Sequence, residues 1–280
     1  MNEERAAALA DSGARAEGER GFVGRARSRL GMAYRACGLG YLIVYAVRKA
    51  LGSLSDQLER RLVAMEQRRG VVAPWTISAS RFTALENKAL WNTYDWSKLG
   101  EEWSRSPQWK REILERLFFP NVPEGAVAVE IGPGGGRWTE YLLKRCSQVH
   151  VVDVAERALE LCRERFGSAP NLALHLSSGH DLAVSDASVD VVWSYDVFVH
   201  INALDTDGYL KEIARVLKGG GRAVIHHPGE PARGVKVRRG WRSDSTERLV
   251  LQSARGAGLA VESQSRDLVN AGDVLTVFRK

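Results

Sequence analysis

Short apolar runs of four to six residues follow one another through the second half of the chain, separated by charged or periodic stretches. Runs of this length, bounded by turn residues, are typical of buried strands. Six of them predict strands, at residues 128–131, 149–153, 172–176, 189–194, 222–226 and 274–278. A helical pattern over residues 209–217, which we expect to end on a glycine cap, precedes the fifth run. This alternation predicts an α/β fold with helices on both faces of the sheet.

The first 120 residues follow a different pattern and predict an α-helical N-terminal extension. Residues 1–25 contain few large apolar side chains and many charges, which predicts a disordered or frayed basic N-terminus. Leucines recur at three- and four-residue steps within residues 26–70, as in a helix or a coiled coil. This extension could pack on its own domain, form a homodimer, or lie on a membrane surface. Residues 71–120 hold five of the eight tryptophans and predict an aromatic-rich helical segment before a domain at residues 121–280.

A glycine-rich turn after the first predicted strand is the strongest chemical signal. Residues 130–137 read E-I-G-P-G-G-G-R, and Asp153 ends the second strand 21 residues after Gly132. A strand, a glycine turn, a helix and a strand that ends on an acid build half of a nucleoside-binding site. Arg137 takes the place of the third glycine of the dinucleotide motif, and Glu130 would repel a pyrophosphate. Both features weaken the interpretation as an NAD-linked oxidoreductase.

The pattern E-x-G-x-G-x-G resembles the first motif of the class I S-adenosylmethionine-dependent methyltransferases of small-molecule type. Further motifs within residues 71–280 follow in the family's order, among them R-V-L-K-G-G-G before the fifth strand. The resemblance implies a seven-stranded, Rossmann-like methyltransferase sheet, with S-adenosyl-L-methionine as cofactor and S-adenosyl-L-homocysteine as product. It places these residues at the cofactor: Glu130, Gly132, Gly134, Arg137, Asp153, Val154, Ser178, Gly179, His180, Ser194 and Tyr195.

The same resemblance implies a role for each part of the cofactor site. Glu130 and Arg137 would contact the methionine end, Asp153 the ribose hydroxyls and Val154 the adenine face. The segment 178–180 would lie at the adenine edge, where the family often has an acid.

Three histidines near the predicted sheet edge could act in catalysis. Methyl transfer requires alignment of the acceptor with the methyl carbon and, for a hydroxyl acceptor, a base. His200, after the fourth strand, is the first candidate, with Asp196 as an alternative base or as the group that orients the imidazole. His226 and His227 end the fifth strand, where open α/β sheets bind ligands. We expect His226 to serve as a further candidate base and His227 as a substrate contact.

The resemblance also implies that the helical segment 71–120 forms a lid or cap over the cofactor and substrate. Tyr94 and Trp96 are the candidate lid residues, and their aromatic faces would also attract a sulfonium. Adjacent residues of a strand point to opposite faces, so His226 and His227 cannot easily chelate one ion, and we expect no metal.

Charge and composition indicate the class of methyl acceptor and the cellular compartment. Residues 1–70 carry 13 Lys and Arg against 8 Asp and Glu, whereas the rest of the chain carries 27 against 26. A catalytic half so close to neutral argues against a nucleic-acid partner and favours a small-molecule acceptor. Three cysteines without metal spacing, the lack of a bilayer-length apolar run and the lack of a signal peptide predict a cytoplasmic protein.

We therefore expect methyl transfer to a hydroxyl, or an amine, of a small molecule in natural-product or glycan tailoring. The basic run 236–242 could attract an anionic acceptor or remain a solvated loop. The alternative is a catalytically silent cofactor-binding protein whose N-terminal helices recruit a partner. Intact cofactor motifs fit both hypotheses, and turnover distinguishes them.

Overall fold

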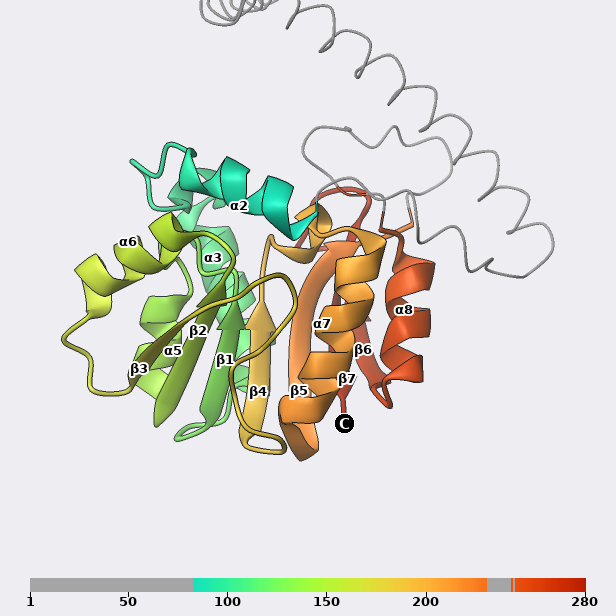
Figure 1. The fold of residues 1–280 in the computed structure, drawn as a ribbon. Helices are drawn as coiled ribbons and strands as arrows, with labels where there is room; N and C mark the ends of the chain where they lie inside the picture. The colour runs from blue at the N-terminus through green and yellow to red at the C-terminus, as the bar shows by residue number, and fades with distance from the viewer. Residues whose placement is uncertain (1–82, 231–242, 244) are drawn as a thin grey trace, which may run out of the picture. The chain divides into compact units, whose positions relative to one another are not determined.

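The chain divides into two units, Met1–Thr76 and Ile77–Lys280. The computed structural model describes residues 83–230, 243 and 245–280, all of which belong to the second unit (Figure 1). The predictions for residues 1–25 and 26–70, and for the basic run 236–242, therefore lie outside the described residues. The first twelve residues of the predicted lid segment, 71–82, also lie outside them.

A seven-stranded sheet forms the centre of the described unit and confirms the predicted fold class. Its strand order is β3-β2-β1-β4-β5-β7-β6, and β7 runs antiparallel to both of its neighbours. Every predicted run falls within one observed strand. The strands are β1 (Val127–Ile131), β2 (Gln148–Asp153), β3 (Leu172–Leu176), β4 (Val189–Ser194), β5 (Leu217–Pro228), β6 (Ala260–Ser265) and β7 (Asp273–Arg279).

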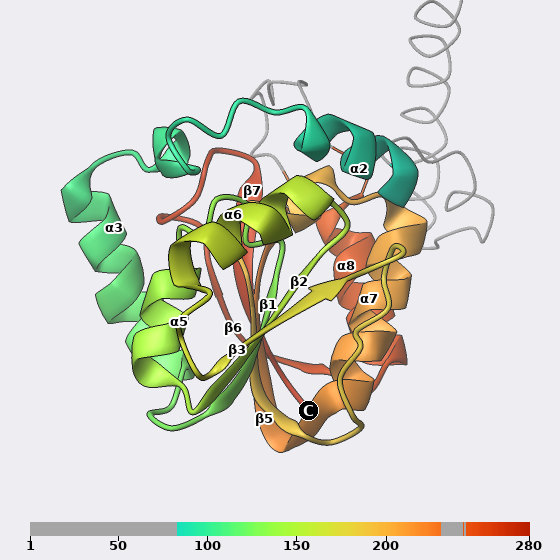
Figure 2. The ribbon, with the colours of Figure 1, turned by 60° about the vertical axis from the view of Figure 1, so that its left-hand side comes forward.

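Helices cover both faces of this sheet, as the sequence predicts. In Figure 2, α3 (Pro107–Ile113) and α5 (Thr139–Arg145) lie on one side, and α7 (Ala203–Val216) and α8 (Glu247–Gly256) on the other. The remaining helical segments are α2 (Ala84–Asn92), η2 (Glu101–Trp103), η3 (Leu114–Phe118), α4 (Phe119–Asn121), α6 (Glu156–Phe166) and η4 (Phe198–His200). Residues 177–188, which join β3 to β4, contain no helix.

Apolar side chains fill the space between the sheet and each helical layer. Leu142 of α5 and Cys162 of α6 belong to the core on one face, and Leu210 of α7 and Val250 of α8 belong to the core on the other. Strands buried on both faces are apolar along almost their whole length. This explains why the strands were visible in the sequence as short continuous runs.

The helix before β5 differs from its prediction at both ends. α7 begins at Ala203 rather than at Tyr209, because the side chain of Asn202 caps it by accepting a hydrogen bond from Asp205 N at 2.7 Å. The predicted glycine cap is wrong, since Leu217 follows the helix in an extended conformation and starts β5. Gly220, with φ of +81°, lies instead within an irregular part of the β4–β5 pairing.

The helix α2 lies across the end of the sheet (Figure 1). Its first residue is tied to α7, since Ala84 N donates to Asp205 Oδ2 at 3.1 Å. Its last residue is tied to α6, since Asn92 Nδ2 donates to Glu156 Oε2 at 2.7 Å. None of the helices in the described part of the chain is long and apolar enough to cross a membrane.

Candidate active site

A cavity of about 460 Å³ lies where β1, β2 and β4 end, with α2 and η2 contributing to its wall. The carboxyl ends of parallel strands are the place where open α/β sheets bind ligands. Ten of the predicted site residues line it: Trp96, Gly132, Gly134, Arg137, Asp153, Val154, Gly179, Tyr195, Asp196 and His200.

The glycine turn adopts backbone conformations that require glycine. Gly132 and Gly134 have φ of +71° and +55°. A Cβ on Gly132 would lie 2.4 Å from Cγ2 of Val197, and a Cβ on Gly134 would lie 2.7 Å from Cη2 of Trp96. The turn is therefore held closely between the loop after β4 and the lid segment.

Two buried carboxyl groups stand near the glycine turn. Asp153 ends β2, is 8% exposed, and accepts a hydrogen bond from Ala155 N at 2.8 Å. Burial raises its pKa to about 6, against the effect of the neighbouring backbone N–H groups. Glu130 lies beneath the turn, where Thr139 Oγ1 donates to its Oε2 at 2.6 Å. Burial, together with the charge of Asp153, raises the pKa of Glu130 to about 7.

An ion pair joins the glycine turn to the loop after β4. Nη2 of Arg137 lies 2.5 Å from Oδ2 of Asp196, and the guanidinium also lies over the ring of Tyr195 at 5.6 Å. Nη1 of Arg137 is buried and has no hydrogen-bond partner among the described residues. Asp196 has φ of +62°, in the left-handed region that is costly for a residue with a side chain.

Aromatic rings from the lid segment form one wall of the cavity. Trp91, Trp96 and Trp103 line it, and their ring centroids lie 5.8–6.2 Å apart. Tyr94 lies behind this wall, stacked on Trp103, and its hydroxyl donates to Glu102 Oε1 at 3.0 Å. Of the two predicted lid residues, Trp96 therefore faces the cavity and Tyr94 supports the wall.

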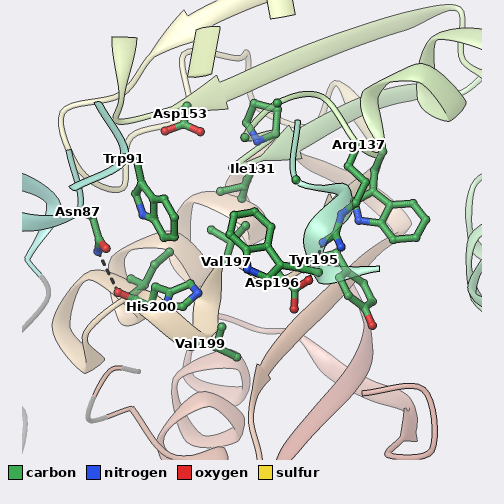
Figure 3. A pocket seen from close by; sticks show the side chains of 18 of the residues that line it. Asn87, Trp91, Ile131, Arg137, Asp153, Tyr195, Asp196, Val197, Val199 and His200 are labelled. Carbon is green, nitrogen blue, oxygen red and sulfur yellow. Dashed lines mark hydrogen bonds and ion pairs between the residues drawn. The ribbon is translucent and has the colours of Figure 1, made fainter. Parts of the chain in front are cut away.

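His200 stands at the lid side of the cavity. Its ring lies 5.3 Å from that of Trp91, and its carbonyl oxygen accepts a hydrogen bond from Asn87 Nδ2 at 2.9 Å. Figure 3 shows Trp91 and His200 on one side of the cavity and Arg137 with Asp196 on the other. The predicted base and the predicted cofactor residues thus border one space.

The remaining predicted residues do not line the cavity. Ser178 and His180 are exposed; Ser178 Oγ donates to Asp181 Oδ1, and the ring of His180 packs near Gly208. Ser194 is buried, and its hydroxyl donates to Ile131 O.

The two histidines of β5 point to opposite faces of the sheet, as predicted. His226 lies 4.8 Å from the ring of Tyr195, whereas His227 contacts Thr276 through Nε2 and stacks on Phe278. Both are buried and lie behind the cavity wall, so neither meets a ligand directly in this arrangement.

Sequence reasoning missed several residues of the site. Trp91, Trp103, Arg105 and Asn270 line the cavity, and Asp273 lies behind it. Trp91 and Trp103 could have been predicted as site residues, because they lie in the same aromatic-rich segment as Trp96. Arg105 and Asn270 could not be predicted, since they contact each other across 165 positions. Asp273 could not be predicted either, since its partner His226 lies on another strand.

The donor set suits a nucleoside cofactor with a positive centre. Asp153 presents a carboxylate at the end of β2, while the glycine turn leaves room for close backbone approach. Burial raises the pKa of both Glu130 and Asp153, and a positive centre bound close to them would favour their ionised forms. The buried Nη1 of Arg137 would complement a carboxylate. Within the described residues, no group of three or more His, Cys, Asp or Glu side chains could hold a metal ion.

Comparison with known proteins shows what this region is similar to. Residues 129–225 match the family described as a methyltransferase domain. The demethylmenaquinone methyltransferase of Tropheryma whipplei (strain Twist) is 30% identical over 142 residues, which are 51% of this chain and 57% of the relative. Methyltransferase GfsG of Streptomyces halstedii is 29% identical over 118 residues, 41% of each chain. The chain thus spans about half the length of the curated relatives it matches.

Solved structures share the fold at low sequence identity. A geranyl diphosphate C-methyltransferase from Streptomyces coelicolor, in complex with Mg²⁺, geranyl-S-thiolodiphosphate and S-adenosyl-L-homocysteine, has a TM-score of 0.55 at 13% identity. The match covers 74% of this chain and 99% of that one. A SAM dependent methyltransferase from Aquifex aeolicus has a TM-score of 0.50 at 20% identity, covering 66% and 98%. These likenesses show the fold.

Proposed function

Because this chain carries a class I, Rossmann-like S-adenosylmethionine-dependent methyltransferase domain, we propose that the protein transfers the methyl group of S-adenosylmethionine to a hydroxyl or an amine of a small molecule. A setting in natural-product or glycan tailoring remains our expectation. The observation that carries this proposal is that the glycine turn, Asp153 and His200 line the same cavity. A cofactor site and a titratable side chain on one cavity suit transfer chemistry better than binding alone.

Different residues of the site would bind different parts of the cofactor. Asp153 would accept hydrogen bonds from the ribose hydroxyls, and Val154 and Gly179 would border the adenine. Arg137 would donate to the methionine carboxylate, and Glu130 would stabilise the positive end from beneath the turn. The bound cofactor supplies an activated methyl group on a sulfonium, so the protein must chiefly align the acceptor and exclude water.

His200 would serve a hydroxyl acceptor as the base. A ring nitrogen of His200 would take the hydroxyl proton as the O–C bond to the methyl carbon forms and its S–C bond breaks, with the electron pair of that bond left on the sulfur of S-adenosylhomocysteine. The imidazolium would later release the proton to water. An imidazole titrates close to neutral pH, which suits this transfer. Trp91, 5.3 Å away by ring centroids, would fix the orientation of the His200 ring.

The acceptor side is lined by aromatic and apolar side chains. Trp91, Trp96, Val197, Val199 and Ile201 all line the cavity. Such a wall favours a small molecule with an apolar or aromatic body over an extended nucleic acid, and the near-neutral catalytic half of the sequence agrees with it.

Calorimetric titration with S-adenosylmethionine, S-adenosylhomocysteine and NAD in parallel tests the cofactor. We expect saturable binding of the first two and none of NAD. A screen of phenols, other alcohols and amines for formation of S-adenosylhomocysteine then tests turnover. Binding of NAD alone would overturn the proposal, and binding of the first two without any turnover would favour the catalytically silent alternative.

A further inference from the structure

Four ionisable side chains form a continuous series beside the cavity. Nε2 of His226 lies 3.3 Å from Oδ2 of Asp273, and Nδ1 of His226 lies 3.0 Å from Oδ1 of Asp196. The other carboxylate oxygen of Asp196 pairs with Nη2 of Arg137 at 2.5 Å. Asp196 and Arg137 line the cavity, whereas His226 and Asp273 are 1% and 2% exposed and lie behind it.

The charges of this series balance only when His226 is protonated. Two carboxylates then face one imidazolium and one guanidinium, and the set is neutral. A neutral imidazole would leave one excess negative charge in a buried place, which is costly. Burial opposes the charge on His226, but the flanking carboxylates of Asp196 and Asp273 outweigh it and raise the pKa of the imidazole.

Nδ1 of His226 meets both the main chain and the side chain of Asp196. The backbone N of Asp196 lies 3.1 Å from this atom and Oδ1 of the same residue lies 3.0 Å from it. The position of the imidazole ring is therefore tied to the backbone as well as to the carboxylate of Asp196.

This arrangement makes Asp196 a poor base. Burial would raise the pKa of its carboxyl group, but the hydrogen bond from His226 and the charges of His226 and Arg137 hold that pKa far below its usual range. Both carboxylate oxygens are engaged, and a base that is this weak accepts a proton inefficiently near neutral pH. A positional role for Asp196 fits these contacts better than proton transfer.

The series fixes two walls of the cavity against each other. Asp196 keeps its left-handed backbone conformation next to Val197, whose side chain packs against Gly132. Arg137 follows the glycine turn and is held between Asp196 and the rings of Trp138 and Tyr195. Movement of Asp196 would therefore displace both the loop after β4 and the guanidinium beside the glycine turn.

We propose that His226 and Asp273 are positioning residues, which hold Asp196 and Arg137 in the arrangement that binds the methionine end of the cofactor. This inference rests on the proposed function and adds to it a residue pair outside the cavity. It also gives His226 a role other than that of a base.

His227 provides a matched control, since it is the next residue, is equally buried, and lies on the opposite face of the sheet. The full-length variants His226→Gln, Asp273→Asn and His227→Gln are compared by calorimetric titration with S-adenosylhomocysteine. Each is measured at a temperature where circular dichroism shows it folded. We expect His226→Gln and Asp273→Asn to weaken binding at least tenfold, about 1.4 kcal/mol, and His227→Gln to weaken it less than threefold.

The pH dependence of binding separates positioning from general loss of stability. In the wild type, S-adenosylhomocysteine affinity should fall as the pH rises past the raised pKa of His226, because the neutral ring no longer balances Asp196 and Asp273. Arg137, Tyr195 and His227 also face this ring and remain unchanged in His226→Gln. The affinity of that variant should therefore not decrease in this pH range. Titration of the ligand's own amino group affects both proteins equally.

The possible outcomes distinguish failure of this inference from failure of the proposed function. If the wild type binds S-adenosylhomocysteine and both His226→Gln and Asp273→Asn bind it within twofold of the wild-type affinity, this inference is overturned. The proposed function would then remain intact. Equal losses in His226→Gln and His227→Gln, with the same pH profile as the wild type, would reveal a purely structural effect and also overturn it. No binding by the wild type would instead overturn the proposed function and this inference together.

Discussion

The two sides of the cavity differ in how the chain builds them. The cofactor side comes from one continuous stretch, in which β1, the glycine turn, α5 and β2 end at Asp153. The acceptor side is assembled from distant segments, since Asn87 of α2 contacts His200 across 113 positions. The first side is therefore specified by local sequence, whereas the second depends on tertiary packing. Substitutions should separate cofactor affinity from turnover along this division.

The largest effect is expected on the acceptor side. We predict that His200→Ala slows methylation of a hydroxyl acceptor about a hundredfold or more, the usual contribution of a general base. S-adenosylhomocysteine affinity should stay within about twofold, since His200 lies across the cavity from Arg137 and Asp196 (Figure 3). Single-turnover kinetics and calorimetry measure the two quantities.

His175→Ala serves as its control, because His175 is a half-buried histidine on β3 that pairs with His150 outside the cavity. Full activity of His200→Ala would remove the base from this side of the cavity. Reduced affinity and rate together would mean that the two sides are not separable.

The next effect concerns the cofactor side. Asp153→Ala should weaken S-adenosylmethionine binding by about 1.5–3 kcal/mol through loss of charge-assisted hydrogen bonds. Asp153→Asn, which keeps the size of the side chain and one acceptor, should lose less. Calorimetric titration measures which of the two variants loses more affinity. Unchanged affinity in Asp153→Ala would contradict the assignment of Asp153 to the ribose hydroxyls.

A smaller effect tests the contact between the two sides. Gly134→Ala adds a Cβ 2.7 Å from Trp96 at a φ of +55°, so the lid must shift. Gly125→Ala imposes similar backbone strain at φ of +73° with nothing within 4 Å. Both should lose about 1 kcal/mol of folding stability, but only Gly134→Ala should also weaken cofactor binding, by about tenfold. Equal binding by the two variants would show that the position of Trp96 does not matter to the cofactor.

The same division explains what the sequence could predict. The central strands β1, β2, β4, β5 and β7 could be predicted because they are largely apolar and buried, whereas the edge strand β6 is exposed and mostly polar. The glycine turn and Asp153 could be predicted because their spacing is local. The start of α7 was missed although Asn202 is a good capping residue, since the prediction followed the apolar pattern from Tyr209. Asp273 could not be predicted, because its partner lies on β5 and its burial arises only when β7 pairs with that strand. Ser178 and His180 were placed by resemblance, but the helix-free segment 177–188 leaves both exposed.

The smallest effect comes from the carboxyl groups on the cofactor side. Their pKa values, about 7 for Glu130 and about 6 for Asp153, are raised by burial, so both groups take up protons as the pH falls from 8 to 5.5. A cationic ligand favours the ionised forms, and if it lowers the summed pKa of the two groups by about half a unit, affinity changes about threefold between high and low pH. We therefore predict that S-adenosylmethionine binds about threefold more weakly at pH 5.5 than at pH 8.

S-adenosylhomocysteine, which has no sulfonium charge, should show a smaller change over the same range. Glu130→Gln should reduce the difference between the two ligands, because it removes the group with the higher pKa. Calorimetry in two buffers of different ionisation enthalpy measures the protons released on binding at pH 6.5. Equal proton release for both ligands would mean that these carboxyl groups do not respond to the sulfonium charge, and that the cofactor side recognises shape and hydrogen bonding alone.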